Sequence, residues 1–441
     1  MIQKKIMLKK IYIQFIAVVI FVITLFPSCK KDYGNLNNPT VEAYLQDATR
    51  DQLNNLVSGT ESAMRNELGL YLDDIGVLGR EMYRFSGADP RYTTDLLGAS
   101  DATLNNTGFY ITNTWSAKYR VIKNCNLLIE AAANSTVVGD TEKKGYSGFA
   151  KTIKAYQFLL LLNLTGENGI RMAVSDPSNL GPVLSYDEAL QAIADLFDEG
   201  AADLAVGEVA FPLSSGFSNY NTAEGLVKFN RALAARVAVY RGQWAEALSN
   251  LSASFYDPAG DLYDGVFHVF GTGSGDQLNS AFFPQNQAGE VRVVHPSFAA
   301  DITANDDRIN KTSLRASPAS YTGLTGDRDV WVYTSSTAPA AIVRNEELIL
   351  IKAEAEIHLE HFDLATDALN IIRNAHGLGN YSGAANADAL TDEMLNQRRY
   401  SLFFEGHRWI DLRRYNRIDE LPIDRPGDDL WTSFPLPNTE G

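Results

Sequence analysis

The chain has 441 residues, a formal charge of −16 and 45% hydrophobic residues, an ordinary apolar content for a globular protein. So acidic a chain lacks the basic footprint that nucleic-acid partners or anionic lipid surfaces require. Its only two cysteines are Cys29 and Cys125, so we expect neither a disulfide framework nor a cysteine metal site.

The N-terminus carries the features of a bacterial lipoprotein signal peptide. Four lysines precede residue 11, and residues 11–26 form an apolar run that contains one Gln and one Thr. A bilayer-spanning helix needs about 20 apolar residues, so this shorter run favours a cleaved signal peptide. Ser28 and Cys29 follow in the arrangement of a lipobox, which predicts a signal peptide over residues 1–28 and lipidation at Cys29. Cleavage of residues 1–28 removes four lysines and no acidic residue, which changes the formal charge of the chain from −16 to −20.

Beyond a polar, turn-rich stretch that we interpret as a tether (residues 29–39), helical periodicity dominates the chain. Residues 146–165 are apolar almost all round, as expected for a helix buried among others. Ser185 and Glu188 form a capping box that indicates the start of a further helix. We predict a mainly α domain over residues 40–441, with a helical scaffold at 40–254 and 341–415 and a C-terminal tail at 416–441.

Two segments of this scaffold resemble tetratricopeptide helix pairs. The first segment, 230–254, matches the repeat's pattern of small, turn-forming, aromatic and large apolar residues. The matching positions are Ala235, Gly242, Trp244, Ala247 and Leu251. The second, 346–375, does so at Ala353, Phe362, Ala365 and Leu369. A long insertion separates the two copies, so they are not tandem repeats.

The insertion, residues 255–340, has no sustained helical period. It holds eight Gly, five Pro and eleven aromatic residues but a single Lys. Long irregular segments inside a compact domain usually carry function, and the aromatic content argues against disorder. We predict loops with short strands, one of them at 330–333.

The C-terminal part carries the most specific motif. Residues 396–415 resemble the conserved motif of the SusD/RagB family, and a Pro-Leu-Pro sequence follows at 435–437. The matching residues are Arg398, Leu402, Glu405, Gly406, Arg408, Asp411, Leu412 and Arg414. Gln397 and Ser401 depart from the motif, since the family usually has Glu at both positions. We interpret the motif as architectural: its apolar residues are expected to be buried, and Gly406 suits a left-handed helix end.

The resemblance implies a function as well as a fold. SusD-like proteins are outer-membrane lipoproteins that face the cell exterior and are not enzymes. They bind an extracellular oligosaccharide and deliver it to a SusC-like TonB-dependent transporter. A peptide ligand, as in RagB-like relatives, and a surface glycoside hydrolase on a helical scaffold remain as alternatives. The family's ligand face is built by loops of the N-terminal half and of the insertion.

Aromatic residues near polar ones are the candidate ligand contacts, because a ring covers the apolar face of a sugar while polar side chains bind its hydroxyls. Two loop regions fit this pattern, one near residues 83–92 and one at 321–333. The strongest candidate is Trp331, since a strand at 330–333 would place it on one face with Tyr333. The full set of predicted ligand residues is Trp331, Tyr333, Tyr321, Tyr83, Tyr92 and Asp329.

No motif identifies a catalytic or cofactor site. His358 and His361 are spaced i, i+3, whereas the zinc-protease motif needs i, i+4, so we predict no metal ligands here. Bound calcium is an alternative that rests on aspartates without EF-hand spacing. They are Asp257, Asp261, Asp264, Asp306 and Asp307. Turn formation explains these residues equally well.

The lipobox interpretation predicts acylation at Cys29. A fatty-acid probe fed to cells that express the protein should label the wild type and not the Cys29→Ala variant, whereas Cys125→Ala should label normally. Equal labelling of the wild type and Cys29→Ala would contradict the prediction.

Overall fold

The computed structural model describes residues 41–176, 178–274 and 276–440. The signal peptide, Cys29 and the tether therefore lie outside the described residues. The chain divides into a short N-terminal unit, Met1–Tyr44, and a large unit, Leu45–Gly441, that holds the fold. Among the helices of the described residues, none is long and apolar enough to cross a membrane.

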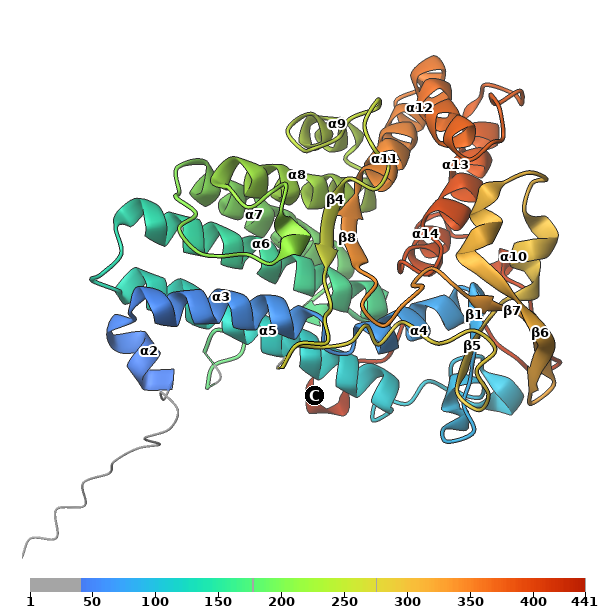
Figure 1. Ribbon diagram of the computed structural model, residues 1–441, viewed down its shortest axis with the longest axis horizontal. Coiled ribbons are helices and arrows are strands. Elements are labelled where there is room, and N and C mark those ends of the chain that lie inside the picture. Colours follow the sequence, from blue (N-terminus) through green and yellow to red (C-terminus); the bar gives the residue numbers. More distant parts are fainter. Residues whose placement is uncertain (1–40, 177, 275, 441) are drawn as a thin grey trace, which may run out of the picture. The chain divides into compact units, whose positions relative to one another are not determined.

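Helices dominate the large unit, as predicted (Figure 1). Those that precede the insertion are α2 (Val41–Asp47), α3 (Arg50–Met64), α4 (Leu68–Leu78), α5 (Phe109–Asn134), α6 (Asp140–Thr165), α7 (Tyr186–Ala205), α8 (Ala223–Tyr240) and α9 (Trp244–Ser252). Those that follow it are α11 (Asn345–His358), α12 (Phe362–Ala375), α13 (Ala387–Ser401) and α14 (Arg408–Arg414). The capping box predicted at Ser185 is present, with Glu188 accepting from the Ser185 backbone N–H at 3.0 Å.

The two tetratricopeptide-like segments form the helix pairs α8–α9 and α11–α12. Gly242 makes the turn of the first pair with a positive φ of 68°, which only glycine adopts readily. The small and large apolar positions of both repeats are buried, among them Ala247 and Ala365. Helices α9 and α11 lie side by side, so the two pairs continue one stack although the insertion separates them in sequence (Figure 1).

The insertion contributes most of the strands. These are β4 (Gly265–His268), β5 (Val291–Val294), β6 (Thr312–Tyr321) and β7 (Leu324–Val330), with α10 (Pro296–Asp301) between β5 and β6 and β8 (Ala340–Arg344) at its end. Strand β1 (Met82–Phe85) joins a four-stranded sheet in the order β1-β5-β7-β6, while β4 pairs with β8 and the short β2 (Ile170–Arg171) pairs with β3 (Val183–Leu184). Through β1, the insertion is tied to the N-terminal half of the chain.

The strand predicted at 330–333 is wrong. Strand β7 ends at Val330, and the Trp331 backbone N–H donates instead to the carbonyl of Lys311 at 2.8 Å. The chain therefore leaves the sheet at Trp331, and Trp331 and Tyr333 do not share a strand face.

The C-terminal motif is architectural, as predicted. Leu402, Phe403 and Trp409 are buried, and Gly406 has a φ of 87°. Asp411 accepts hydrogen bonds from Arg398 at 2.7 Å and from Arg414 at 2.8 Å. Burial alone would raise the pKa of Asp411, but the two guanidinium groups outweigh it and lower the pKa to about 2.

The Asp411→Asn substitution should therefore destabilise the fold strongly. It leaves two buried guanidinium groups without their shared carboxylate, and breaking a buried ion pair typically costs about 3–5 kcal/mol. Urea unfolding of the mature chain measures the change. Asp419→Asn is the control, since this exposed aspartate should change stability by less than about 0.5 kcal/mol. An equal loss of unfolding free energy in the two variants would show that the ion pairs of Asp411 contribute nothing to stability.

Candidate binding site

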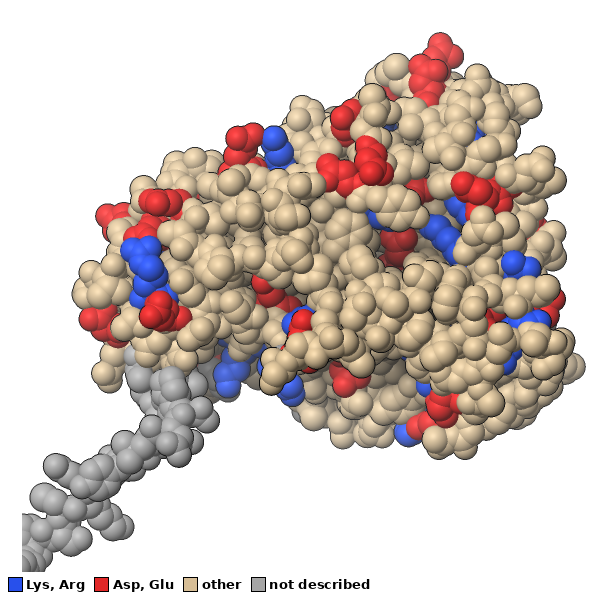
Figure 2. All heavy atoms as spheres, in the orientation of Figure 1, with Lys and Arg blue, Asp and Glu red and all other residues tan. Residues whose placement is uncertain are grey.

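Two cavities of ligand-binding size lie where the insertion meets the rest of the large unit. The first, which we call the Trp331 cavity, measures about 680 Å³. It opens as a hollow with acidic and basic groups inside it (Figure 2). Its wall comes from the loop before β4, the segment 307–311, the loop 331–334, strand β8, the end of α12 and the turn before α14. No single stretch of sequence forms it.

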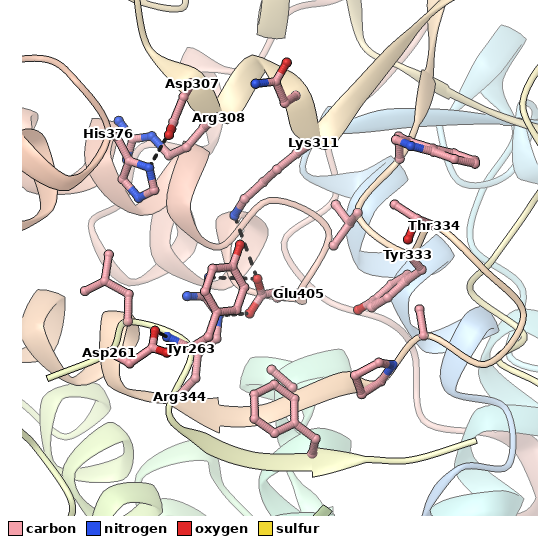
Figure 3. Close-up of a pocket in the computed structure, with 18 of the residues that line it drawn as sticks. Asp261, Tyr263, Asp307, Arg308, Lys311, Tyr333, Thr334, Arg344, His376 and Glu405 are labelled. Atoms are coloured by element: carbon pink, nitrogen blue, oxygen red, sulfur yellow. Dashed lines mark hydrogen bonds and ion pairs between the residues drawn. The ribbon is translucent and has the colours of Figure 1, made fainter. Parts of the chain in front are cut away.

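Buried ion pairs form the floor of the Trp331 cavity (Figure 3). Arg344 donates to both carboxylate oxygens of Glu405, at 3.0 and 2.9 Å, and also pairs with Glu346. The Lys311 ammonium lies 4.0 Å from the Glu405 carboxylate and donates to the carbonyl of Ser401. Burial lowers the pKa of Lys311. The charges at the floor are therefore largely matched.

His376 extends this network toward the rim. Its Nδ1 lies 2.7 Å from the carboxylate of Asp307, and its Nε2 lies 2.8 Å from that of Glu346. Burial would raise the pKa of Glu346, but Arg344 outweighs this effect and the pKa is lowered, so Glu346 stays ionised. The Asp307 side chain is 60% exposed and presents its remaining acceptor capacity to the solvent side of the cavity.

Four aromatic residues border the same cavity, the half-buried Phe267 of β4 among them. Tyr263 is 61% exposed, and its ring lies 5.2 Å from the Arg344 guanidinium carbon. Trp331 is half-buried, with its ring centroid 6.2 Å from that of Phe282. Tyr333 is buried and presents only part of its side chain. Exposed rings beside hydrogen-bonding groups are suited to sugars.

The second cavity, which we call the Arg120 cavity, measures about 750 Å³. One face of α5 lines it with Asn113, Ser116, Ala117 and Arg120, at helical spacing. The opposite wall holds Arg65, Asn66, Glu67, Leu70, Asp73, Arg84, Tyr92, Gln277, Leu278, Ser280, Phe283 and Arg292. This cavity combines the N-terminal half with the insertion, the combination that the family resemblance implies for a ligand face.

The six predicted ligand residues do not lie together in one cavity. Trp331 and Tyr333 line the Trp331 cavity, and Tyr92 lines the Arg120 cavity. Tyr83 is buried against Phe85 and His295 and borders neither cavity.

The other two predicted residues also lie outside both cavities. Tyr321 packs against Phe85, with ring centroids 6.0 Å apart. Asp329 is buried, pairs with Arg315 and accepts a hydrogen bond from the Asn286 backbone N–H at 2.7 Å. Partners within the protein thus occupy both side chains.

Sequence reasoning missed the exposed Tyr263 and Arg120 and the half-buried Phe283. Tyr263 and Phe283 belong to the aromatic-rich insertion, so its composition carried a signal for them. Arg120 carried none, because a lone arginine on an amphipathic helix is indistinguishable from a solvated one.

The five aspartates considered as calcium ligands each have their own hydrogen-bond or ion-pair partner. Asp257 and Asp261 accept from the backbone N–H groups of residues two positions on, at 2.9 and 2.8 Å, as in Asx turns. Asp264 accepts from Tyr220, Asp306 pairs with Arg308, and Asp307 pairs with His376. Across the described ranges, no three or more His, Cys, Asp or Glu side chains gather as a metal site.

The two histidines weighed for zinc have other partners. His358 stacks on the half-buried Trp244, with ring centroids 3.9 Å apart, and its Nε2 lies 2.9 Å from the Tyr415 hydroxyl. His361 lies 2.7 Å from the Glu356 carboxylate. The helix pairs α8–α9 and α11–α12 thus use these side chains as packing and hydrogen-bonding groups.

Comparison with known proteins agrees with this fold. Residues 304–425 match the model of the SusD family. No curated protein matches the chain. A surface glycan-binding protein A from Bacteroides thetaiotaomicron is 14% identical, with a TM-score of 0.69 over 90% of this chain and 97% of the other.

Two further solved structures are similar over comparable lengths. The same glycan-binding protein in complex with laminarihexaose is 13% identical, with a TM-score of 0.68 over 89% of this chain and 97% of the other. A SusD superfamily protein from Bacteroides vulgatus is 16% identical, with a TM-score of 0.67 over 89% and 96%. The SusD family model thus matches the segment that carries the C-terminal motif, and the chain shares the fold of the solved SusD superfamily structures.

Proposed function

We propose that this protein is a non-enzymatic capture protein that binds an oligosaccharide in the Trp331 cavity. The observation that carries the proposal is the placement of the exposed ring of Tyr263 and the half-buried ring of Trp331 around hydrogen-bonding groups. A similar fold binds laminarihexaose in the Bacteroides thetaiotaomicron protein, which supports a glycan as the ligand class.

The floor of the cavity favours binding over hydrolysis. A glycosidase needs two carboxyl groups with different protonation states, one of them able to donate a proton. Both carboxylate oxygens of Glu405 accept hydrogen bonds from the guanidinium group of Arg344, and the Lys311 ammonium lies 4.0 Å away. Asp307 is exposed and paired with His376. Neither carboxyl group lies in the apolar pocket that a glycosidase provides for its catalytic acid.

The Trp331→Ala substitution should weaken binding of a neutral hexasaccharide by about 30-fold. Loss of an aromatic anchor often costs 2 kcal/mol or more, which corresponds to this ratio. Calorimetric titration with laminarihexaose, or with any neutral hexasaccharide that the wild type retains on a glycan array, measures the change.

Trp244→Ala is the matched control, because Trp244 is also half-buried but lies on the scaffold away from both cavity walls. It should leave the affinity unchanged. Unchanged affinity in a folded Trp331→Ala variant would remove Trp331 from the site. Release of reducing ends over time by the purified wild type would favour the hydrolase alternative, and retention of peptides instead of glycans would favour the RagB-like one.

We further propose that the protein is anchored by a lipid at Cys29 on the outer membrane and delivers its ligand to a SusC-like TonB-dependent transporter. The match of residues 304–425 to the SusD family model supports this proposal. Affinity capture of the tagged protein from outer membranes in mild detergent should recover a β-barrel protein of roughly twice its mass or more. Capture without any barrel would argue against delivery.

A further inference from the structure

Three cations line the Trp331 cavity, and three carboxylates in its wall match them. The pairs are Arg308 with Asp306 at 2.6 Å, Arg344 with Glu346 and with Glu405, and Lys311 with Glu405 at 4.0 Å. Arg308 and Arg344 are almost fully buried. Among the described lining residues, a ligand therefore finds no unmatched lysine or arginine at the floor.

Two exposed carboxylates at the rim are not matched in this way (Figure 3). Asp261 accepts a hydrogen bond from the backbone N–H of Tyr263 at 2.8 Å, and this neutral donor leaves its charge in place. Asp307 lies 2.7 Å from His376, whose other ring nitrogen lies 2.8 Å from the Glu346 carboxylate. A neutral imidazole has one N–H to donate and no charge. Even a protonated His376 matches only one of the two rim carboxylates.

The excess of carboxylates continues beyond the rim. A second hollow of about 520 Å³ shares the rings of Tyr263 and Phe267 with the Trp331 cavity. Its described lining adds Asp257 and Asp264 but contains no Lys, Arg or His. Both aspartates accept hydrogen bonds from neutral donors, at 2.9 and 2.6 Å. A hollow lined by charges of one sign concentrates their field, so a ligand at the rim meets a negative potential.

The aromatic rings at this rim suit a positively charged ligand as well as a sugar face. Tyr263 is largely exposed, Trp331 is half-buried, and both line the cavity. The faces of tyrosine and tryptophan rings attract ammonium groups. Tyr263 also follows Asp261 by two residues, and the hydrogen bond between them keeps the ring and the carboxylate together.

We infer that the Trp331 cavity selects oligosaccharides that carry a protonated amine, as 2-amino sugars do, over neutral and acidic ones. The inference rests on the proposed function and names the sugar class that the same cavity prefers. An ammonium group has three N–H donors, and the carboxylates of Asp261 and Asp307 are acceptors. A uronate or a sulfated sugar meets like charges instead, and like charges brought together weaken binding.

The test titrates the mature protein with a glucosamine tetrasaccharide and with its fully N-acetylated counterpart, at a pH below the pKa of the amines. The amine-bearing probe should bind about tenfold more tightly, a ratio that one charge-assisted hydrogen bond supplies. Added salt should weaken the preference. A uronate tetrasaccharide should bind more weakly than its carboxyl-reduced counterpart.

Variants of the rim assign the preference to its carboxylates. Asp261→Asn and Asp307→Asn should each reduce the ratio of the two affinities, and the double variant should abolish it. Both residues are exposed, so the melting temperatures should stay close to that of the wild type. Asp367→Asn is the matched control, because Asp367 is exposed on α12 but lies outside the cavity lining. It should preserve the ratio.

Equal affinity for the amine-bearing and the N-acetylated probe would overturn the inference, as would the same ratio in the double variant and in Asp367→Asn. A lysine tetrapeptide presents the same ammonium chemistry on a different backbone. Tighter binding of this peptide than of the glucosamine tetrasaccharide would also overturn the inference, in favour of a basic peptide ligand. Failure of the proposed function gives a different result, since a folded Trp331→Ala variant would then bind the neutral hexasaccharide as the wild type does.

Discussion

A set of buried ion pairs holds the C-terminal motif against the helical scaffold, and the remaining architecture depends on it. Asp411 joins Arg398 and Arg414, and Arg414 donates in turn to Glu354 of α11 at 2.8 Å. Removing such charges from water costs free energy, so a buried ion pair stabilises the fold only when both partners are present. The Arg344–Glu405 pair extends the same principle to the Trp331 cavity, so the scaffold and the cavity floor share one electrostatic framework.

The two departures from the family motif show how that framework is completed without their carboxylates. Ser401 accepts from Arg308 through its hydroxyl at 2.9 Å and from Arg344 through its carbonyl at 2.6 Å. Arg308 takes its ion pair from Asp306, two residues away. Gln397 donates to Glu393 at 2.7 Å, which leaves its buried Oε1 without a partner among the described residues. Nearby acidic residues thus replace part of the expected network.

Local rules predicted the scaffold, whereas the cavities arise from contacts that no local rule encodes. Helical periodicity, the capping box at Ser185 and the turn at Gly242 depend on residues close in sequence, and each appears as predicted. The floor of the Trp331 cavity brings together Lys311, Arg344 and Glu405 from separate segments. The strand expected at 330–333 failed for the same reason, because Trp331 pairs with the backbone of Lys311 and leaves the sheet.

Aromatic content located the insertion as the ligand-facing region but could not separate core rings from exposed ones. Tyr83 and Tyr92 lie nine positions apart, yet Tyr83 packs on His295 while Tyr92 faces a cavity. The difference lies in their partners: His295 follows the distant strand β5, whereas the ring of Tyr92 packs on Phe109 at the start of α5. The wall of the Trp331 cavity belongs mainly to the insertion, whereas the buried pairs of Asp411 and Glu354 belong to the helices and the C-terminal motif. Changes in the insertion can therefore alter the ligand while the scaffold keeps its stability.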